Sequence, residues 1–431
     1  MAALTYITAG ESHGAGILAV VSGMPTGVAV DIAFIDGELA RRQGGYGRSG
    51  RQRIEHDRVE ILSGVRRGVT TGAPVTLMVR NADSRLDDLE RTPGVSVPRP
   101  GHADFAGSVK YWTTDCRDTL ERASARETAG RVAAGALARV MLREMSGEMG
   151  EGRGAGAAGS INAIESCAFV RAIGGVEMGG IGGAATRPAG EVMVIEAKDM
   201  AALRAKRDGS ETYCPDEGAT AGQREAIRQA KIEKTTLGGV IECHVLNVPP
   251  GIGSTMHWFE RLDARLAGAV MGVQAIKGVE IGAGFEAARR RGHEVHDALA
   301  YDAARRGEAG LGFVRATNRA GGIEGGMSNG APIVLRAAMK PISTLLRGMA
   351  SVELNTKDAA VSVYERSDIC AAPAASVVIE NVVAFEIARA VREKFGGDSI
   401  AEAREQYRRH LEVARTLPLE GQSRGADGGA S

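Results

Sequence analysis

The sequence predicts an α+β fold with two related halves, and three observations support this prediction. Short apolar runs that end at glycine or proline, such as residues 17–22 and 240–248, predict β-strands. Longer segments with helical spacing of apolar residues, such as residues 32–42 and 374–395, predict α-helices. The third observation is an internal repeat, which suggests that one strand–loop–strand unit occurs twice.

The repeat relates residues 64–77 to residues 322–335. Both segments follow the pattern G-[VI]-x-x-G-[VM]-[ST]-x-G-A-P-[VI]-x-L, and each lies downstream of a strand that ends at proline and glycine. A duplicated β-loop-β unit would divide the chain into two related halves. Repeated use of common turn residues would give a similar pattern.

The remaining elements follow from local patterns along the chain. Strands are predicted at residues 5–7, 17–22, 59–62, 74–79, 192–195, 240–248, 332–339 and 360–364. Helices are predicted at residues 32–42, 124–142, 222–234, 262–271 and 374–395. Residues 81–100 are expected to form a long polar loop, residues 146–160 an exposed insert rich in glycine and alanine, and residues 417–431 a disordered tail.

Composition bounds the class of protein. The 431 residues are 44% hydrophobic and 25% charged, which suits a globular protein with one large domain or two to three ordinary ones. Lys plus Arg equals Asp plus Glu at 53 each and aromatics are only 4%, so we expect no nucleic-acid partner. Five scattered cysteines without C-x-x-C predict a reducing, cytoplasmic location, and we find no signal peptide or bilayer-spanning run.

A helix rich in arginine, alanine and glycine is predicted to begin near Ser124. Ser124 and Glu127 have the spacing of a capping box. Arg122, Arg126 and Arg131 lie around the first turns, where cations oppose the helix macrodipole. Free backbone N–H groups and guanidinium groups together form a good anion site. A tightly packed helix with solvated arginines is an equally open interpretation.

A second candidate anion site is the loop at residues 41–51, which contains Arg42 and Arg48 among several glycines. Glycine-rich backbone and guanidinium groups together suit phosphate or carboxylate binding. The same composition is also typical of a mobile surface loop, and the residues alone leave both interpretations open.

Three ionisable residues lie in glycine or proline phrases: His13, His102 and Asp368. Histidine can donate a proton near neutral pH, although a lone histidine is more often a structural hydrogen-bonding group. Asp368 could act as a base or cap the helix that follows it. The sequence contains no P-loop, no Rossmann fingerprint, no G-x-S-x-G and no metal-ligand cluster.

Together these phrases resemble the chorismate synthase family, in consistent order from about residue 5 to about residue 415. The matching passages are GESHG at 10–14, RRQGGYGR at 41–48, RPGHAD at 99–104, RASARET at 122–128, GVE at 278–280, EGGM at 324–327, MKPIST at 339–344 and ERSD at 365–368. The resemblance implies a single domain at residues 1–415 with a disordered tail at 416–431. It also implies a sandwich of antiparallel β-sheets flanked by helices, with two pseudo-symmetric halves.

The implied activity is that of a carbon–oxygen lyase acting on phosphates. It converts 5-enolpyruvylshikimate 3-phosphate to chorismate by 1,4-anti elimination in the shikimate pathway, which serves aromatic amino acid biosynthesis. Reduced FMN is required although there is no net redox change. The resemblance further implies a homotetramer. The chain shows no reductase domain, so an external flavin reductant is expected, and direct use of NADPH stays open.

The resemblance also assigns roles by position. Arg42, Arg48 and Arg126 would bind the anionic substrate. His13 would protonate the leaving phosphate, His102 would lie near the N1/O2 edge of the flavin, and Asp368 would assist proton removal at flavin N5. The FMN contacts map to Arg122, Ala123, Ser124, Gln274, Ala275, Gly325, Lys340, Pro341, Ile342, Ser343, Thr344 and Arg366.

Two positions depart from the familiar pattern. Ala123 stands where the family usually has serine, so a hydroxyl contact is lost there, and Gln274 stands where asparagine is familiar. Two other classes of protein keep some support from the residues. A nucleotide-binding regulator could use the same arginine and glycine loops without catalysis, and a flavin oxidoreductase would show net redox turnover with NAD(P)H.

Overall fold

The computed structural model of the chain describes residues 3–49, 56–147, 163–179, 191–362 and 367–417. Its core consists of two antiparallel sheets with helices between them. The N-terminal sheet has the strand order β1-β2-β6-β3. Its strands are β1 (Thr5–Ala9), β2 (Gly16–Ser22), β3 (Val59–Ser63) and β6 (Val75–Arg80).

The second sheet has the strand order β10-β15-β9-β7-β8 and is also antiparallel. Its strands are β7 (Glu165–Ile173), β8 (Val176–Glu177), β9 (Gly239–Leu246), β10 (Ile276–Ile281) and β15 (Ile333–Met339). Leaving out the short β8, each sheet has four strands that follow one another along the chain and pair in the same spatial order.

The connections repeat as well. In the N-terminal half, α1 (Ile32–Gln43) joins the second strand to the third, the hairpin β4 (Val65–Arg66)–β5 (Val69–Thr70) precedes the fourth strand, and α4 (Thr128–Ser146) follows. In the C-terminal half the same places are taken by α7 (Leu262–Met271), by the hairpin β13 (Ile323–Glu324)–β14 (Met327–Ser328), and by α9 (Ala372–Phe395). The predicted division into two related halves is therefore confirmed.

Matching hydrogen bonds show how closely the repeated segments agree. Thr70 Oγ1 donates to Pro25 O at 2.5 Å and accepts from Val28 N at 3.0 Å. Ser328 Oγ makes the same pair of bonds with Pro249 O at 2.6 Å and Ile252 N at 2.9 Å. The glycine that opens each copy, 64 or 322, has φ of +79°. A Cβ there would meet the backbone where β6 or β15 begins. The repeat is thus a structural duplication, not a reuse of turn residues.

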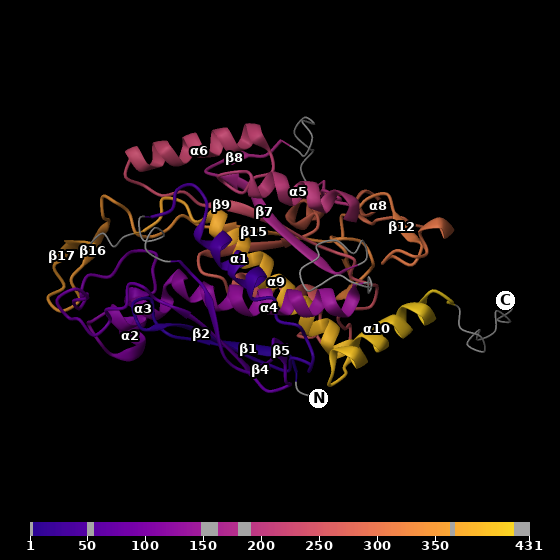
Figure 1. The fold of residues 1–431 in the computed structure, drawn as a ribbon. Helices are drawn as coiled ribbons and strands as arrows, with labels where there is room; N and C mark the ends of the chain where they lie inside the picture. Colours follow the sequence, from indigo (N-terminus) through magenta and orange to yellow (C-terminus); the bar gives the residue numbers. More distant parts are fainter. Residues whose placement is uncertain (1–2, 50–55, 148–162, 180–190, 363–366, 418–431) are drawn as a thin grey trace.

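The layers follow from which face each helix buries (Figure 1). α4 packs on β2 and β6, α9 packs on β7 and β9, and the two helices pack on each other between the sheets. Gly135 allows this close approach, because a Cβ there would lie 2.4 Å from Asn381 O. On the outer face of the second sheet lie α5 (Met200–Asp208) and α6 (Glu217–Ile232). The predicted α+β sandwich is confirmed, with its two longest helices as the inner layer.

The other regular elements are short or peripheral. They are α2 (Asp104–Tyr111), α3 (Arg117–Ala123), η2 (Ala125–Glu127), η3 (Ala197–Asp199), η4 (Gly284–Arg289), α8 (Gly292–Val295), η5 (Ala303–Arg305), α10 (Ile400–Ala414), and the strand pairs β11 (Leu299–Tyr301)–β12 (Phe313–Arg315) and β16 (Ala350–Val352)–β17 (Ala359–Val361). α10 packs against α4 and α9.

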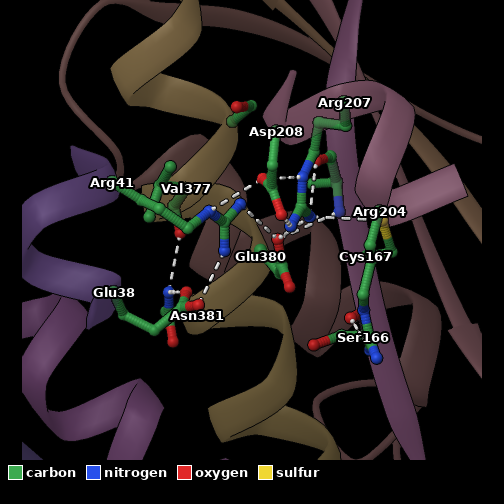
Figure 2. A network of polar contacts seen from close by, with 12 residues as sticks. Glu38, Arg41, Ser166, Cys167, Arg204, Arg207, Asp208, Val377, Glu380 and Asn381 are labelled. Carbon is green, nitrogen blue, oxygen red and sulfur yellow. Dashed lines mark hydrogen bonds and ion pairs between the residues drawn. The ribbon is translucent and has the colours of Figure 1, made fainter. Parts of the chain in front are cut away.

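A buried network of charges ties the inner helices to α1 and α5 (Figure 2). Glu380 on α9 is fully buried and accepts hydrogen bonds from Arg41 at 3.2 Å and from Arg207 at 3.0 Å. Arg139 on α4 lies 2.8 Å from Glu380 and 2.7 Å from Glu38. Because these side chains come from four helices, the network fixes the C-terminal end of α1, where the candidate anion loop begins.

Several local predictions need correction. Residues 192–195 form no strand, since Met193 and Ile195 instead fill a small apolar cluster beside α5. Strands β7 and β10 and helices α2, α3, α5 and α10 were not predicted. α6 begins five residues before the predicted start, at Glu217, where Asp216 accepts a hydrogen bond from Ala219 N at 3.0 Å. β17 ends at Val361, inside the strand predicted at 360–364.

The start of the arginine-rich helix also differs from its prediction. Ser124 Oγ caps the short η2 turn by accepting from Arg126 N at 3.3 Å, and α4 begins at Thr128. The Glu127 carboxylate does not complete a capping box, because it binds Thr8, Arg131 and Gln274 instead. Most of the predicted insert at 146–160 and of the tail at 416–431 lies outside the described residues.

Candidate active site

A cavity of about 510 Å³ lies where the N-termini of α4 and α9 meet, and this volume is typical of small-molecule sites. Equivalent connections of the two halves converge on it. Arg48 comes from the loop after α1, and Gln274 from the loop after α7. His102 comes from the segment between β6 and α4, and Thr344 from the segment between β15 and α9. The duplicated fold therefore builds one site from two sets of matching loops.

Most of the predicted site residues line this cavity. They are His13, Arg42, Arg48, His102, Ala123, Ser124, Arg126, Gln274, Ala275, Lys340, Ile342, Ser343, Thr344 and Asp368. Arg122, Gly325 and Pro341 are not among its lining residues, and Arg366 lies outside the described residues. The exposed Arg122 donates to Thr8 O and Gly10 O, and Gly325 lies in the turn between β13 and β14.

Two buried arginines at the cavity share one carboxylate. Arg42 Nη2 lies 2.6 Å from Asp57 Oδ2, and Arg126 Nη1 lies 2.7 Å from Asp57 Oδ1. Burial, partly offset by Asp57, lowers the pKa of Arg42 to about 10. Burial favours a neutral Asp57, but the charges of Arg42 and Arg126 outweigh it and hold the pKa of this carboxyl below its ordinary value. An anion in the cavity would stabilise both guanidinium groups.

Arg48 is held at the cavity by Asp368. Its guanidinium is ion-paired with Asp368 Oδ2, while Asp368 Oδ1 accepts from Ser49 N at 2.7 Å. The backbone of the loop is also fixed, because Ile369 N donates to Gly47 O at 2.8 Å. For the described residues 41–49, the mobile-loop interpretation is therefore wrong. Asp368 does not cap α9 either, since the helix begins after Ala371 without a side-chain cap.

His13 is 7% exposed and is paired with a buried carboxylate. Its Nδ1 lies 2.9 Å from Glu121 Oε1, and its backbone N donates to Glu121 Oε2 at 2.9 Å. Burial opposes ionisation of Glu121, but the hydrogen bonds and charge of His13 hold the pKa of the carboxyl below its ordinary value. The Nδ1 atom of His13 thus faces Glu121, while its Nε2 lies 3.4 Å from Arg85 Nη2 and 3.8 Å from Asp83 Oδ2.

His102 has a similar buried partner. Its Nδ1 is hydrogen-bonded to Asp104, which also accepts from Arg99 Nε at 2.8 Å. Although burial opposes it, these hydrogen bonds hold the pKa of Asp104 well below its ordinary value. The turn at Gly101 places His102 at the cavity, and the Lys340 ammonium donates to Gly101 O at 2.6 Å. Burial and the charge of Lys277 lower the pKa of Lys340.

Part of the cavity lining consists of small, apolar side chains. It includes Ala275 and three alanines near the start of α9, at 371, 374 and 375. Gln274 Nε2 donates to Glu127 Oε2 at 3.0 Å, while Gln274 Oε1 is buried and receives no hydrogen bond from any described residue. A flat ligand can lie against such small side chains, and an N–H group on it would satisfy the amide oxygen.

Sequence reasoning missed the carboxylates that organise the site. Asp104 and Arg99 belong to the recognised RPGHAD phrase, but Glu121 and Asp57 carry no spacing signal of their own. Glu121 directly precedes the arginine-rich stretch, and Asp57 stands apart from every recognised phrase. Their roles depend on contacts between segments distant in sequence, 108 residues for Glu121 with His13 and 69 for Asp57 with Arg126.

Several guanidinium groups and two carboxylate-backed histidines around one cavity are typical of an enzyme that acts on a small anionic substrate. The family model for chorismate synthase matches residues 4–391. The chorismate synthase of Desulforudis audaxviator is 48% identical over 421 residues, which cover 96% of this chain and 98% of that protein. The chorismate synthase of Symbiobacterium thermophilum is 47% identical over 96% of this chain and 100% of its own length.

A solved structure agrees with these relatives. A crystal structure of chorismate synthase superimposes with a TM-score of 0.73 and 36% identity, and the match covers 97% of this chain and 100% of that one. The chain belongs to the chorismate synthase family. Its activity is that of a lyase that produces chorismate in the shikimate pathway, for the biosynthesis of aromatic amino acids.

No described helix is long and apolar enough to cross a membrane. Among the described residues, no group of three or more histidine, cysteine, aspartate or glutamate side chains could hold a metal ion.

Proposed function

We propose that this cavity binds 5-enolpyruvylshikimate 3-phosphate beside reduced FMN and catalyses the 1,4-anti elimination of phosphate. The pairing of Arg42 and Arg126 with one carboxylate, Asp57, carries this proposal, because it holds two buried guanidinium groups together at the cavity, where they could bind an anionic substrate. Each charge-assisted hydrogen bond in such a desolvated place contributes more than it would in water.

Substrate binding is assigned to Arg42, Arg48 and Arg126. Arg42 and Arg126 are buried and held in place, so they can receive a phosphate or carboxylate without reorganisation. Arg48 has one ion pair, with Asp368, at a cavity wall. A substrate anion that takes over Arg48 would release the Asp368 carboxylate to act on a proton.

The residues present fit FMN as the second ligand. Gln274 offers an amide oxygen that receives no hydrogen bond from any described residue. Lys340, Ser343 and Thr344 offer hydrogen-bond donors in the lining of the same cavity. Ala123 has no side-chain hydroxyl, so only its backbone could form a hydrogen bond with FMN. When bound, reduced FMN would supply electron density for the departure of phosphate and a basic site for the ring proton. His102, held by Asp104 and Arg99, would provide a compensating positive charge for the anionic flavin.

Proton transfer is assigned to His13 and Asp368. His13 is committed to Glu121 through Nδ1, so its Nε2 would protonate the leaving phosphate. Asp368, which lies just before α9, would assist removal of the ring proton of the substrate. Arg122, Gly325, Pro341 and Arg366 are proposed as further FMN contacts from the family pattern alone.

We also propose a homotetramer in the cytoplasm that receives reduced flavin from an external reductant. Five free, buried cysteines suit a reducing compartment. Exposed apolar side chains along α2, at Phe105, Val109 and the 95% exposed Trp112, suit contacts between subunits. Residues 1–415 would form one domain, since both halves share the inner helical layer and contribute loops to the candidate active site.

The proposal is tested by phosphate release from 5-enolpyruvylshikimate 3-phosphate under anaerobic conditions with chemically reduced FMN. We expect turnover with reduced FMN and none with oxidised FMN alone. Equal turnover without flavin would contradict the cofactor assignment. Binding without phosphate release would instead indicate a nucleotide-binding regulator. Stoichiometric consumption of NAD(P)H per turnover would indicate a flavin oxidoreductase.

A further inference from the structure

We propose that Glu121 is a positioning residue for the reaction, because it holds the Nδ1 proton of His13 and thereby makes Nε2 the proton donor. The inference rests on the proposed role of His13 as the acid. Neither the sequence motifs nor the resemblance to the family assigns a role to Glu121.

The contacts between the two residues are extensive and buried. Both carboxylate oxygens lie within 3.0 Å of His13 Nδ1, and one also accepts the backbone N–H of His13 at 2.9 Å. The backbone of Ser12 donates to Glu121 O at 3.1 Å. The Glu121 side chain is fully buried. α3 therefore holds the His13 loop through both its backbone and its carboxylate, and the ring has one orientation.

Other charges surround this pair on both sides. Arg117, one turn earlier on α3, lies 3.3 Å from Glu121 Oε1. On the far side of the ring, Arg85 Nη2 lies 3.4 Å and Asp83 Oδ2 3.8 Å from His13 Nε2. The loop that carries Arg85 is fixed to His13 as well, since Arg85 N donates to His13 O at 2.9 Å. Glu121, at 2.9 Å from the ring, is therefore nearer to it than Asp83 at 3.8 Å.

A buried carboxylate in this position has two chemical effects. It accepts a hydrogen bond from the Nδ1–H group of His13. The neutral ring therefore carries its lone pair on Nε2, and the protonated ring has its transferable proton there. Its charge also stabilises the protonated ring, which is the form required for a general acid. An amide in place of the carboxylate would keep the shape and remove both effects.

The molecule contains a matched pair that does not touch the cavity. On β9, Glu242 Oε1 lies 2.8 Å from His244 Nε2, and both side chains are buried. Burial opposes it, but the hydrogen bond and charge of His244 lower the pKa of Glu242 to about 2. Glu242→Gln therefore measures the structural cost of breaking a buried glutamate–histidine pair without affecting the proposed acid.

The experiment compares Glu121→Gln, Arg117→Gln and Glu242→Gln in the anaerobic phosphate-release assay as a function of pH. For Glu121→Gln we expect turnover to fall at least about tenfold, with substrate affinity within about twofold of wild type. The alkaline limb of its pH–rate profile should move to lower pH. Arg117→Gln removes a competing cation and should move that limb to higher pH, while Glu242→Gln should leave it unmoved.

A double-mutant cycle with His13→Ala separates this inference from the proposed function. His13→Ala should slow phosphate release by about 10²- to 10⁴-fold, and adding Glu121→Gln should then have little further effect. Near-normal turnover in His13→Ala would overturn the proposed acid. A slow His13→Ala with an unshifted pH profile in Glu121→Gln and Arg117→Gln would overturn the positioning role of Glu121. Additive losses in the double variant would likewise mean that Glu121 acts on structure alone.

Discussion

Two clusters of buried charges in this molecule share the same residue types but differ in how their charges are matched. The closed cluster lies around Glu380, and Figure 2 shows Arg41, Arg207 and Asp208 of it; with Arg139 it links α1, α4, α5 and α9. Arg41 lies within 3.5 Å of three carboxylates, and Arg139 and Arg207 each lie within 3.5 Å of two. The open cluster lies at the cavity, where Arg42 and Arg126 share Asp57 and Arg48 is paired with Asp368.

The difference separates structure from function. Charges that are fully matched by their neighbours hold helices together and have no need of a ligand. Guanidinium groups that are gathered beside a cavity are placed to bind an anionic ligand there. The two clusters meet at the end of α1, because Arg41 belongs to the closed one and Arg42 to the open one. The closed cluster therefore supports the backbone from which the open one reaches the cavity.

The largest expected effect concerns the closed cluster. Glu380→Gln removes the charge shared by three guanidinium groups and should lower the free energy of unfolding by about 3–5 kcal/mol, measured by urea denaturation. The arginines hold the pKa of Glu380 below its ordinary value despite burial. A carboxyl group whose pKa is lowered by folding stabilises the fold at pH values above its ordinary pKa of about 4.3. This stabilisation is lost as the pH falls from there through the lowered pKa.

The variant should consequently lose less stability on acidification than the wild type does. An unchanged free energy of unfolding at neutral pH would mean that the closed cluster does not support the inner helices.

A smaller effect is expected from Asp368→Asn in the open cluster. The amide keeps an oxygen for Ser49 N but removes the proton acceptor and the ion pair with Arg48. Single-turnover rates should fall at least about tenfold, while binding titrations should show substrate affinity kept or slightly improved. Normal turnover would leave Asp368 with the role of fastening the Arg48 loop and nothing more.

The sequence predicted the parts of the fold that depend on local or repeated patterns. α7 was predicted to the residue, and the repeat at 64–77 and 322–335 correctly indicated two related halves. β7 escaped prediction because it is buried nearly throughout, so it lacks the alternation that marks an exposed strand. The apolar residues at 192–195 misled in the opposite direction, since Met193 and Ile195 are buried without pairing in a sheet.

The same distinction holds at the site. His13, Arg48 and Asp368 were found from phrases in the sequence, and the structure brings all three to one cavity. Glu121 and Asp57 could not be found in this way, because a carboxylate becomes significant only through the partner that folding places beside it. The capping-box interpretation failed for a related reason, since Glu127 forms an ion pair with Arg131 instead.

The central claim is that the open cluster binds the substrate anion whereas the closed cluster only supports the fold. The most direct test titrates 5-enolpyruvylshikimate 3-phosphate into the wild type, Arg48→Ala and Glu380→Gln, with melting temperatures measured alongside. Arg48→Ala should bind about 10- to 150-fold more weakly, equivalent to about 1.5–3 kcal/mol, and melt near the wild-type temperature. Glu380→Gln should melt lower and, where folded, bind nearly as well as wild type. Unaltered affinity in Arg48→Ala would contradict the account.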